Sequence, residues 1–225
     1  MLAPFFLVKN MSFKQLDLKT WPRIKQYEFF KQYDNPFFNI STNLDVTQLL
    51  SDTKASGQTF SMAMLYASID TANRIDEFKY RLKDDGVVVY DSIYAGSTVL
   101  NDDKTFSFCY FDYFNHFSEF DKFAKKQIDM NNKGLLEFDG RNKDLDIIHY
   151  SVIPWIAFSS FSHPRNYKTD DSVPKIVFGQ YHEKGGRVVM PISVEVHHAL
   201  MDGYHLGQYF SELQKTINNP IFLKK

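Results

Sequence analysis

The chain of 225 residues is 44% hydrophobic and 24% charged, which is typical of a globular protein with one sizeable core. Its 26 basic residues nearly balance 27 acidic ones, and no basic stripe is visible, so we expect no binding to nucleic acid. No apolar run approaches the roughly 20 residues of a transmembrane helix, so we expect no membrane span either. The 22 Phe and 13 Tyr suit a core, an apolar ligand tunnel or a subunit interface, and composition does not choose among them.

Cys109 is the only cysteine, which excludes an internal disulfide bond and a CxxC zinc site. It lies within the aromatic, strand-like run 106–110, so we interpret it as a buried, inert thiol rather than a nucleophile. A single cysteine also fits a reducing compartment, and we expect a cytoplasmic protein.

We expect one domain over residues 11–225, because no linker, repeat or low-complexity segment interrupts the sequence. Residues 1–10 precede the regular pattern and lack the basic start and the small-residue cleavage site of a secretory signal. We interpret them as an extension, either added by cloning or translated from an upstream start.

The first half of the domain alternates helical and strand-like patterns. Thr20-Trp21-Pro22 predicts the start of a helix, with Thr20 as N-cap, and Asp34-Asn35-Pro36 predicts its end. The segments 78–82 and 87–90, joined by a turn at Gly86, predict a β-hairpin. We further expect strands at 37–41, 97–100 and 105–110, and helices from about residue 45, over 59–73 and over 117–130.

The second half is strand-rich and ends in an amphipathic helix. Strands are expected at 147–158, 176–180 and 187–196, the last after a Gly185-Gly186 turn. Asp202-Gly203 opens a helix whose apolar residues recur at steps of four, three and four: Leu206, Phe210, Leu213 and Ile217. The interspersed pattern indicates an α/β layered sandwich, and the absence of GxGxxG and P-loop motifs argues against a nucleotide-binding doubly wound sheet.

The most informative segment is the strand end at His197-His198, which Asp202-Gly203 follows. A general base that acts on a hydroxyl needs a neutral imidazole, held in one tautomer with a free nitrogen toward the substrate. Adjacent residues of a strand point to opposite faces, so at most one of the two histidines faces a given cleft. The spacing alone does not say which one.

Two other interpretations of this segment remain open on the residues alone. His197 suits a core histidine and Asp202-Gly203 a simple helix cap. A metal site of His197, His198 and His205 is disfavoured, because the set lacks the i, i+4 pairing of a zincin and a carboxylate pair near in sequence. On the residues alone, a catalytic role and a structural role of this segment therefore both remain open.

The segment His198-Ala199-Leu200-Met201-Asp202-Gly203 resembles the HxxxDG signature of the chloramphenicol acetyltransferase family of coenzyme A-dependent acyltransferases. Further segments resemble this family in the same order from about Met11 to the last helix. They are Trp21-Pro22-Arg23, Tyr90-Asp91-Ser92, Ser151-Val152-Ile153-Pro154-Trp155, Phe158-Ser159-Ser160-Phe161 and Val189-Met190-Pro191.

The resemblance implies a fold and a mechanism. The fold is a two-layer α/β sandwich with a mixed sheet and flanking helices. His198 would be the general base of an O-acetyltransferase, Ser151 would bind the oxyanion, and Asp202 would form a structural salt bridge with Arg23. Acetyl-CoA would be a co-substrate, with no tightly bound cofactor and no metal. The resemblance also implies a homotrimer in which His198 of one chain faces the acceptor pocket of its neighbour.

The same resemblance implies the binding residues. Tyr181 would contact coenzyme A, and each phenylalanine expected in the acceptor pocket could equally be ordinary core. These phenylalanines are Phe29, Phe30, Phe38, Phe106, Phe138 and Phe161.

The sequence departs from the family around the acceptor and the donor. Phe30 stands where the resistance enzymes have a tyrosine that bonds the drug, Val177 replaces a threonine and Gln180 replaces a lysine. Four polar residues stand where small or apolar pocket residues are expected: Asp34, His163, Arg165 and Lys175. Charged groups are costly to bury alone, so we expect a more open pocket or an acceptor more polar than chloramphenicol. The alternative from another class is a catalytically silent trimeric binding protein.

Overall fold

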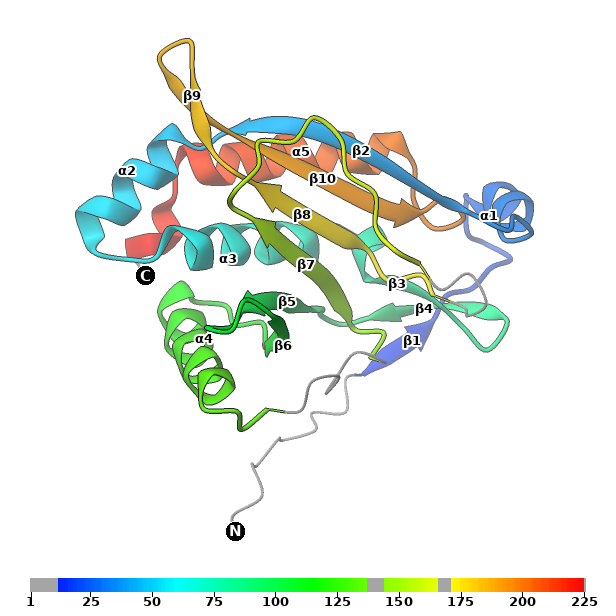
Figure 1. The fold of residues 1–225 in the computed structure, drawn as a ribbon. Coiled ribbons are helices and arrows are strands. Elements are labelled where there is room, and N and C mark those ends of the chain that lie inside the picture. Colours follow the sequence, from blue (N-terminus) through cyan, green and yellow to red (C-terminus); the bar gives the residue numbers. More distant parts are fainter. Residues whose placement is uncertain (1–11, 137–143, 166–170, 225) are drawn as a thin grey trace.

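A mixed β-sheet backed by helices organises the chain in the computed structural model, which describes residues 12–136, 144–165 and 171–224 (Figure 1). Its strands are β1 (Phe13–Gln15), β2 (Phe37–Asp45), β3 (Tyr80–Lys83), β4 (Gly86–Tyr90), β5 (Tyr94–Leu100), β6 (Phe106–Phe111), β7 (Ile147–Ile153), β8 (Lys175–Gly179), β9 (His182–Lys184) and β10 (Arg187–His197). The helices are α1 (Ile24–Phe30), α2 (Thr47–Ser56), α3 (Phe60–Asn73), α4 (Phe117–Asn132) and α5 (Gly203–Asn218), with 3₁₀ turns at Asp76–Lys79 and Ile221–Lys224.

The larger sheet has the strand order β2-β10-β8-β7-β5-β6, and β9 pairs with β10 as a short hairpin. β7 runs parallel to β5 and to β8, whereas the other pairs are antiparallel. A separate small sheet has the order β1-β4-β3. The predicted α/β architecture with a mixed sheet and flanking helices is therefore confirmed.

The two faces of the larger sheet differ in chemistry because side chains alternate along each strand. On β10 the even-numbered residues Ile192, Val194 and Val196 are fully buried and belong to the main core, together with Leu206 and Leu213 of α5. The odd-numbered residues of β10 point to the opposite side, which we call the front face. Figure 1 shows α3 and α5 behind the sheet, and the segment between β7 and β8 crossing the front face.

Most predicted elements are confirmed, with shifted ends. Helix α1 begins at Ile24 rather than after Thr20, and the predicted N-cap is wrong: the Thr20 hydroxyl donates to Asp17 instead. Strand β7 ends at Ile153 rather than at residue 158, because Pro154 has no N–H to continue the ladder. Strands β1 and β9, of three residues each, were not predicted, because so short a segment shows no usable periodicity.

Gly179 allows the segment after β7 to lie directly on the sheet. A Cβ at this position would stand 2.6 Å from Cγ of Pro191 and 2.9 Å from the carbonyl oxygen of Ile156. That carbonyl accepts the backbone N–H of Gln180 at 2.9 Å. The close backbone approach therefore fixes where this segment leaves the sheet.

We expect Gly179→Ala to lower the free energy of unfolding by about 1–3 kcal/mol, because the added methyl group has no space. Gly207→Ala is the matched control: Gly207 is exposed within α5 and nothing lies within 4 Å of its would-be Cβ. This control should raise stability by up to about 1 kcal/mol, since alanine is the better helix former. Urea unfolding of both variants measures the difference, and equal stability of the two would contradict the close packing.

Candidate active site

The chain makes a tight turn where β10 ends. The carbonyl of His197 accepts the backbone N–H groups of Leu200 and Met201, at 3.0 and 3.1 Å. Helix α5 then begins with Asp202 as its N-cap, whose carboxylate accepts the N–H of Tyr204 at 3.0 Å. The predicted cap at Asp202 is confirmed, and the turn separates the surroundings of the two histidines.

Hydrogen bonds hold both the backbone and the ring of His198. Its N–H donates to the carbonyl of Pro36 at 2.8 Å, and its Nδ1 lies 3.1 Å from the carbonyl oxygen of Met201. A carbonyl can only accept, so this contact assigns the proton to Nδ1 and leaves Nε2 with a free lone pair. The ring stacks on Phe30, with centroids 3.9 Å apart at 8°, and also contacts Phe38 at 4.6 Å.

The salt bridge expected between Arg23 and Asp202 is present, and it connects α5 to the turn before α1. Arg23 also donates through Nη2 to the carbonyl of His198 at 3.3 Å. Burial raises the pKa of Asp202, but the hydrogen bond and charge of Arg23 outweigh it and keep the pKa below its usual range. His205 completes the support, because its Nδ1 accepts the N–H of Asp202 at 3.0 Å.

His197 lies on the other side of the strand end. It is 4% exposed, and burial followed by the charge of Arg165 lowers its pKa to about 4. Its Nδ1 accepts the N–H of Ala199 at 3.2 Å, and its ring contacts Phe37 edge-on. His197 is therefore the buried structural histidine of the pair, and His198 is the one with a nitrogen free for chemistry.

Ser151 lies on β7, far from His198 in the same chain. It pairs with Val177 of β8, which pairs with Ser193 of β10. His198 follows Ser193 by five residues, roughly 16 Å along the strand, and two strand spacings add roughly 10 Å across the sheet. One chain thus holds the expected base and the expected oxyanion donor in two separate places.

The phenylalanines expected in the acceptor pocket divide between these two places. Phe30 and Phe38 contact the His198 ring, and Phe29 contacts Phe30 edge-on. Phe106 lies on the front face with Ser151. Its strand partner Leu100 shares a face of β5 with Gly96, and Gly96 pairs with His149, two residues before Ser151 on β7. Phe161 contacts Phe158, whose ring stands over Gly179 on that face. Phe138 lies outside the described residues.

A cavity of about 460 Å³ opens beside the ends of β7 and β8. Tyr181 lines it, and its ring meets Phe60 at the start of α3 edge-on, with centroids 5.5 Å apart. Val152, the neighbour of Ser151 on β7, also lines this cavity. The sequence did not indicate Phe60 as a lining residue, since it reads as the first apolar residue of a core helix.

Polar residues of the front face form a connected group that the sequence revealed only in part. His163, Arg165 and Lys175 were expected near the acceptor, but His149 and Asp171 were missed. Register brings His149 beside Lys175, and Lys175 beside Glu195. Asp34, by contrast, is exposed in the turn after α1.

The remaining candidate features are the single cysteine, a metal site and a membrane span. Cys109 is fully buried, as predicted, and burial raises the pKa of its thiol to about 11, which disfavours the reactive thiolate. Within the described ranges, no group of three or more His, Cys, Asp or Glu side chains is arranged to hold a metal ion. No helix in the described part of the chain is long and apolar enough to cross a membrane.

The sequence model of the chloramphenicol acetyltransferase family matches residues 11–214. The chain belongs to this family. Chloramphenicol acetyltransferase 3 of Escherichia coli is 27% identical over 212 residues, covering 94% of this chain and all of that protein. The chloramphenicol acetyltransferase of Proteus mirabilis is 28% identical, covering 92% of this chain and 95% of that protein.

Solved structures agree with the family assignment. A chloramphenicol acetyltransferase superposes with a TM-score of 0.83 at 28% identity, over 92% of this chain and all of that one. A dihydrolipoamide acetyltransferase of Azotobacter vinelandii shares the fold, with a TM-score of 0.68 at 12% identity over 90% of this chain. In this family member, the HxxxDG histidine expected from the sequence is the one that the turn presents with a free Nε2.

Proposed function

We propose that this protein transfers the acetyl group of acetyl-CoA to a hydroxyl group of a small acceptor. The observation that carries the proposal is the His198 imidazole, whose Nδ1 is engaged by the Met201 carbonyl and whose Nε2 is left as a base. The names of the relatives, chloramphenicol acetyltransferases, support an acceptor of the chloramphenicol type and a role in antibiotic resistance.

In the proposed reaction, Nε2 of His198 takes the proton of the acceptor hydroxyl as its oxygen attacks the thioester carbonyl. The Ser151 hydroxyl donates a hydrogen bond to the oxyanion of the tetrahedral intermediate. The intermediate collapses with cleavage of the C–S bond, and the imidazolium returns its proton to the departing sulfur. The products are the O-acetyl ester and free coenzyme A, and no cofactor has to be tightly bound.

The salt bridge of Arg23 with Asp202 holds the base in place rather than relaying its proton. Arg23 bonds the carboxylate of Asp202 and the carbonyl of His198, so it joins the start of α5 to the base. A buried or half-buried ion pair of this kind is better evidence for fixed geometry than for stability.

The donor is assigned to the cavity lined by Tyr181 and Phe60. Val152 lines this cavity and lies one residue before the end of β7. A thioester bound there would therefore lie next to the strand that carries Ser151. Acetyl-CoA would therefore enter from the side opposite to the acceptor.

We further propose a homotrimer, in which His198 of one subunit completes the Ser151 half of the next. The separation of the two residues within one chain supports this arrangement. The nearly full-length similarity to bacterial acetyltransferases supports a cytoplasmic location.

His198→Ala should lower turnover of acetyl-CoA with an acceptor by at least about 10²–10⁴, because the variant lacks the general base. Thiol release from acetyl-CoA measures the rate, and thermal unfolding checks that the variant remains folded. His197→Ala is the matched control, expected to act mainly on stability because His197 is buried and faces the other side. Near-wild-type turnover in His198→Ala would exclude His198 as the base.

Mixing His198→Ala with Ser151→Ala should restore activity, because a mixed trimer contains one interface with both residues intact. After unfolding and refolding together in equal amounts, about three quarters of trimers are mixed and about a quarter of all sites are intact. Each variant refolded alone is the control, and light scattering gives the oligomeric state. Absence of recovery in mixed trimers, or a stable monomer, would contradict a site shared between subunits.

Chloramphenicol should be acetylated with a high Michaelis constant, because Phe30 offers no hydroxyl to bond the drug. Phe30→Tyr should lower this constant by up to about tenfold, the effect of one neutral hydrogen bond. Phe13→Tyr adds the same hydroxyl on β1, away from the site, and should change nothing. Efficient acetylation by the unmodified protein would show that Phe30 and the polar front-face residues lie outside the acceptor pocket.

A further inference from the structure

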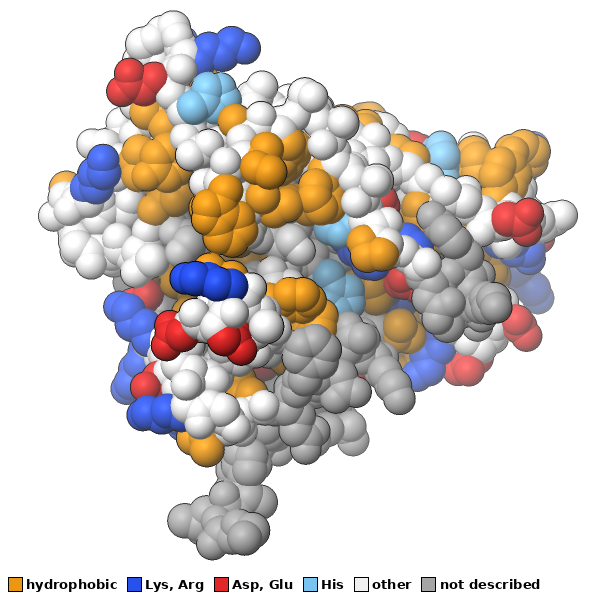
Figure 2. Space-filling model, in the orientation of Figure 1, with side chains coloured by type: hydrophobic (Ala, Val, Ile, Leu, Met, Phe, Trp, Pro, Cys, Tyr) orange, Lys and Arg blue, Asp and Glu red, His pale blue; other side chains and the backbone are white. Residues whose placement is uncertain are grey.

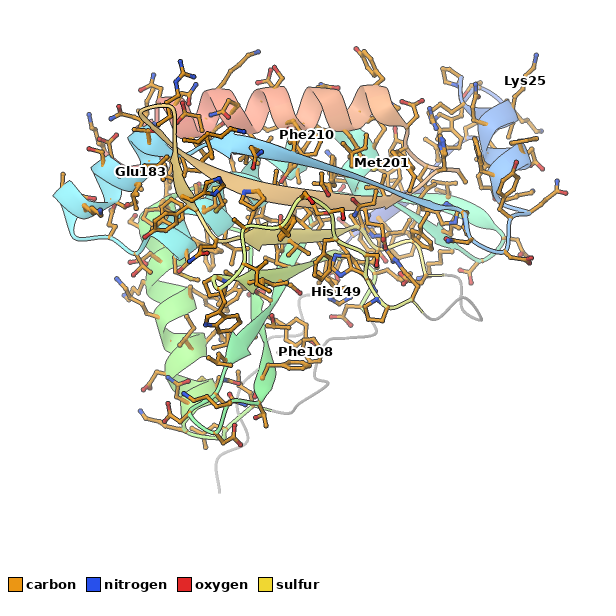
Figure 3. All side chains as sticks on the ribbon, turned by 45° about the horizontal axis from the view of Figure 1, so that its top comes forward. Lys25, Phe108, His149, Glu183, Met201 and Phe210 are labelled. Carbon is orange, nitrogen blue, oxygen red and sulfur yellow. The ribbon has the colours of Figure 1, made fainter. Side chains whose placement is uncertain are left out.

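A cluster of charged and imidazole side chains covers the front face of the sheet beside Ser151. His149, Lys175 and Glu195 occupy neighbouring register positions on β7, β8 and β10, so their side chains leave the sheet on one face. His149 precedes Ser151 by two residues and shares its face, roughly 7 Å away along the strand. Figure 3 shows His149 on the side of the sheet away from α5, and histidine side chains reach the surface there in Figure 2.

Arg165 enters this cluster from the segment between β7 and β8. Its side chain is 1% exposed. Its Nε donates to Oε1 of Glu195 at 2.6 Å, and its Nη1 donates to Oδ2 of Asp171 at 2.8 Å and to the carbonyl of Val173 at 3.0 Å. The guanidinium also lies 3.7 Å from the ring centroid of Phe37. Arg165 is therefore held rigidly, with two carboxylates already engaged.

Two buried nitrogen atoms of the cluster have no hydrogen-bond partner among the described residues, Nη2 of Arg165 and Nε2 of His163. Buried polar groups are nearly always paired, and an unpaired charged donor is especially unfavourable. His163 is close enough to Lys175 and Arg165 that their charges, after burial as the largest cause, lower its pKa to about 3. The rigid guanidinium therefore has one nitrogen, Nη2, that lacks a partner among the described residues, beside a neutral imidazole.

Lys175 has spare hydrogen-bonding capacity in the same place. Its ammonium group donates to the carbonyl of Pro164 at 2.8 Å, and the carboxylates of Asp171 and Glu195 are both bonded to Arg165. Burial, and then the charge of Arg165, lowers the pKa of Lys175 in spite of these carboxylates. Burial thus disfavours the charged form of Lys175, and an anion bound beside its ammonium group would favour that form.

We propose that this enzyme prefers, over neutral acceptors such as chloramphenicol, a hydroxyl compound that also carries an anionic oxygen group, bound by Lys175 and by Nη2 of Arg165. This inference rests on the acetyl transfer proposed above, because Ser151 defines where the reacting hydroxyl stands. Lys175 pairs with His149 on the neighbouring strand, so it is displaced from Ser151 by two residues, roughly 7 Å, along the strands and by one strand spacing, roughly 5 Å, across the sheet. A carboxylate and a phosphate monoester share the required oxygen chemistry.

The test compares acceptors that differ only in charge, with the assembled wild-type protein and acetyl-CoA. One pair is 5-hydroxypentanoate and its methyl ester, and the other is 4-hydroxybutyl phosphate and its neutral dimethyl ester. We expect kcat/KM to favour the anionic member of at least one pair by about tenfold or more, the effect of a charge-assisted hydrogen bond. The pair with the larger ratio of anion kcat/KM to ester kcat/KM identifies carboxylate or phosphate as the preferred group.

Variants then assign the preference to residues. Lys175→Met should reduce the ratio of the anion's kcat/KM to that of its ester by about tenfold or more, and Lys175→Arg should keep most of this ratio. Lys184→Met, on the exposed strand β9, is the matched control and should keep all of it. Lys175 is only partly buried, so we expect its variants to fold. Thermal unfolding of each variant checks this.

Calorimetric titration of the same anions, without acetyl-CoA, separates the two proposals. Binding that Lys175→Met weakens, with no acetylation of any acceptor, would support the anion site and overturn the acetyl transfer. Esters acetylated as well as anions, with the same rates in Lys175→Met, would support acetyl transfer and overturn the anionic acceptor. Anion binding equal in wild type and Lys175→Met would also overturn it.

Discussion

The alternation of side chains along β10 is the constraint on which the rest of the site depends. Its even-numbered residues Val194 and Val196 enter the core, so the odd-numbered Glu195 and His197 must face the front of the sheet. At the strand end this alternation separates two adjacent histidines. His197 is buried on the front side. The turn that its carbonyl stabilises places the His198 ring against the rings of Phe30 and Phe38. Main-chain hydrogen bonds thus already position the proposed base, and the salt bridge of Arg23 with Asp202 adds to them.

The elements and the catalytic segment could be predicted from the sequence, because their signals are local. The turn at Gly185-Gly186 and the cap at Asp202 are set by neighbours within a few residues, and both elements formed where expected. The choice between His197 and His198 could not be made from spacing, since either can face a cleft. It required the register of β10 with its partners, which is a property of segments far apart in the chain.

The same reasoning explains which site residues were missed. His149 has no distinguishing motif, and only its pairing with Lys175 across two parallel strands brings it to the front face. Asp171 lies in an irregular segment, where no periodicity predicts a contact, yet its carboxylate meets Arg165 at 2.8 Å. The residues expected near the acceptor came from a family resemblance. The structure places Phe30 against His198 and Phe161 against His163 of the polar cluster, a division that the linear order does not reveal.

The proposed base and the residues that hold it lie apart from the polar cluster of the front face. His198, Arg23 and Asp202 sit at one end of the sheet, with contacts that do not involve Arg165 or Lys175. If the proposed roles hold, substitutions of Arg165 or Lys175 should change which acceptor is recognised without displacing His198. A buried ion-pair network such as Arg165 with Glu195 and Asp171 contributes little net stability compared with apolar packing. Among the described residues, Nη2 of Arg165 has no hydrogen-bond partner, and the proposed anionic acceptor would supply one.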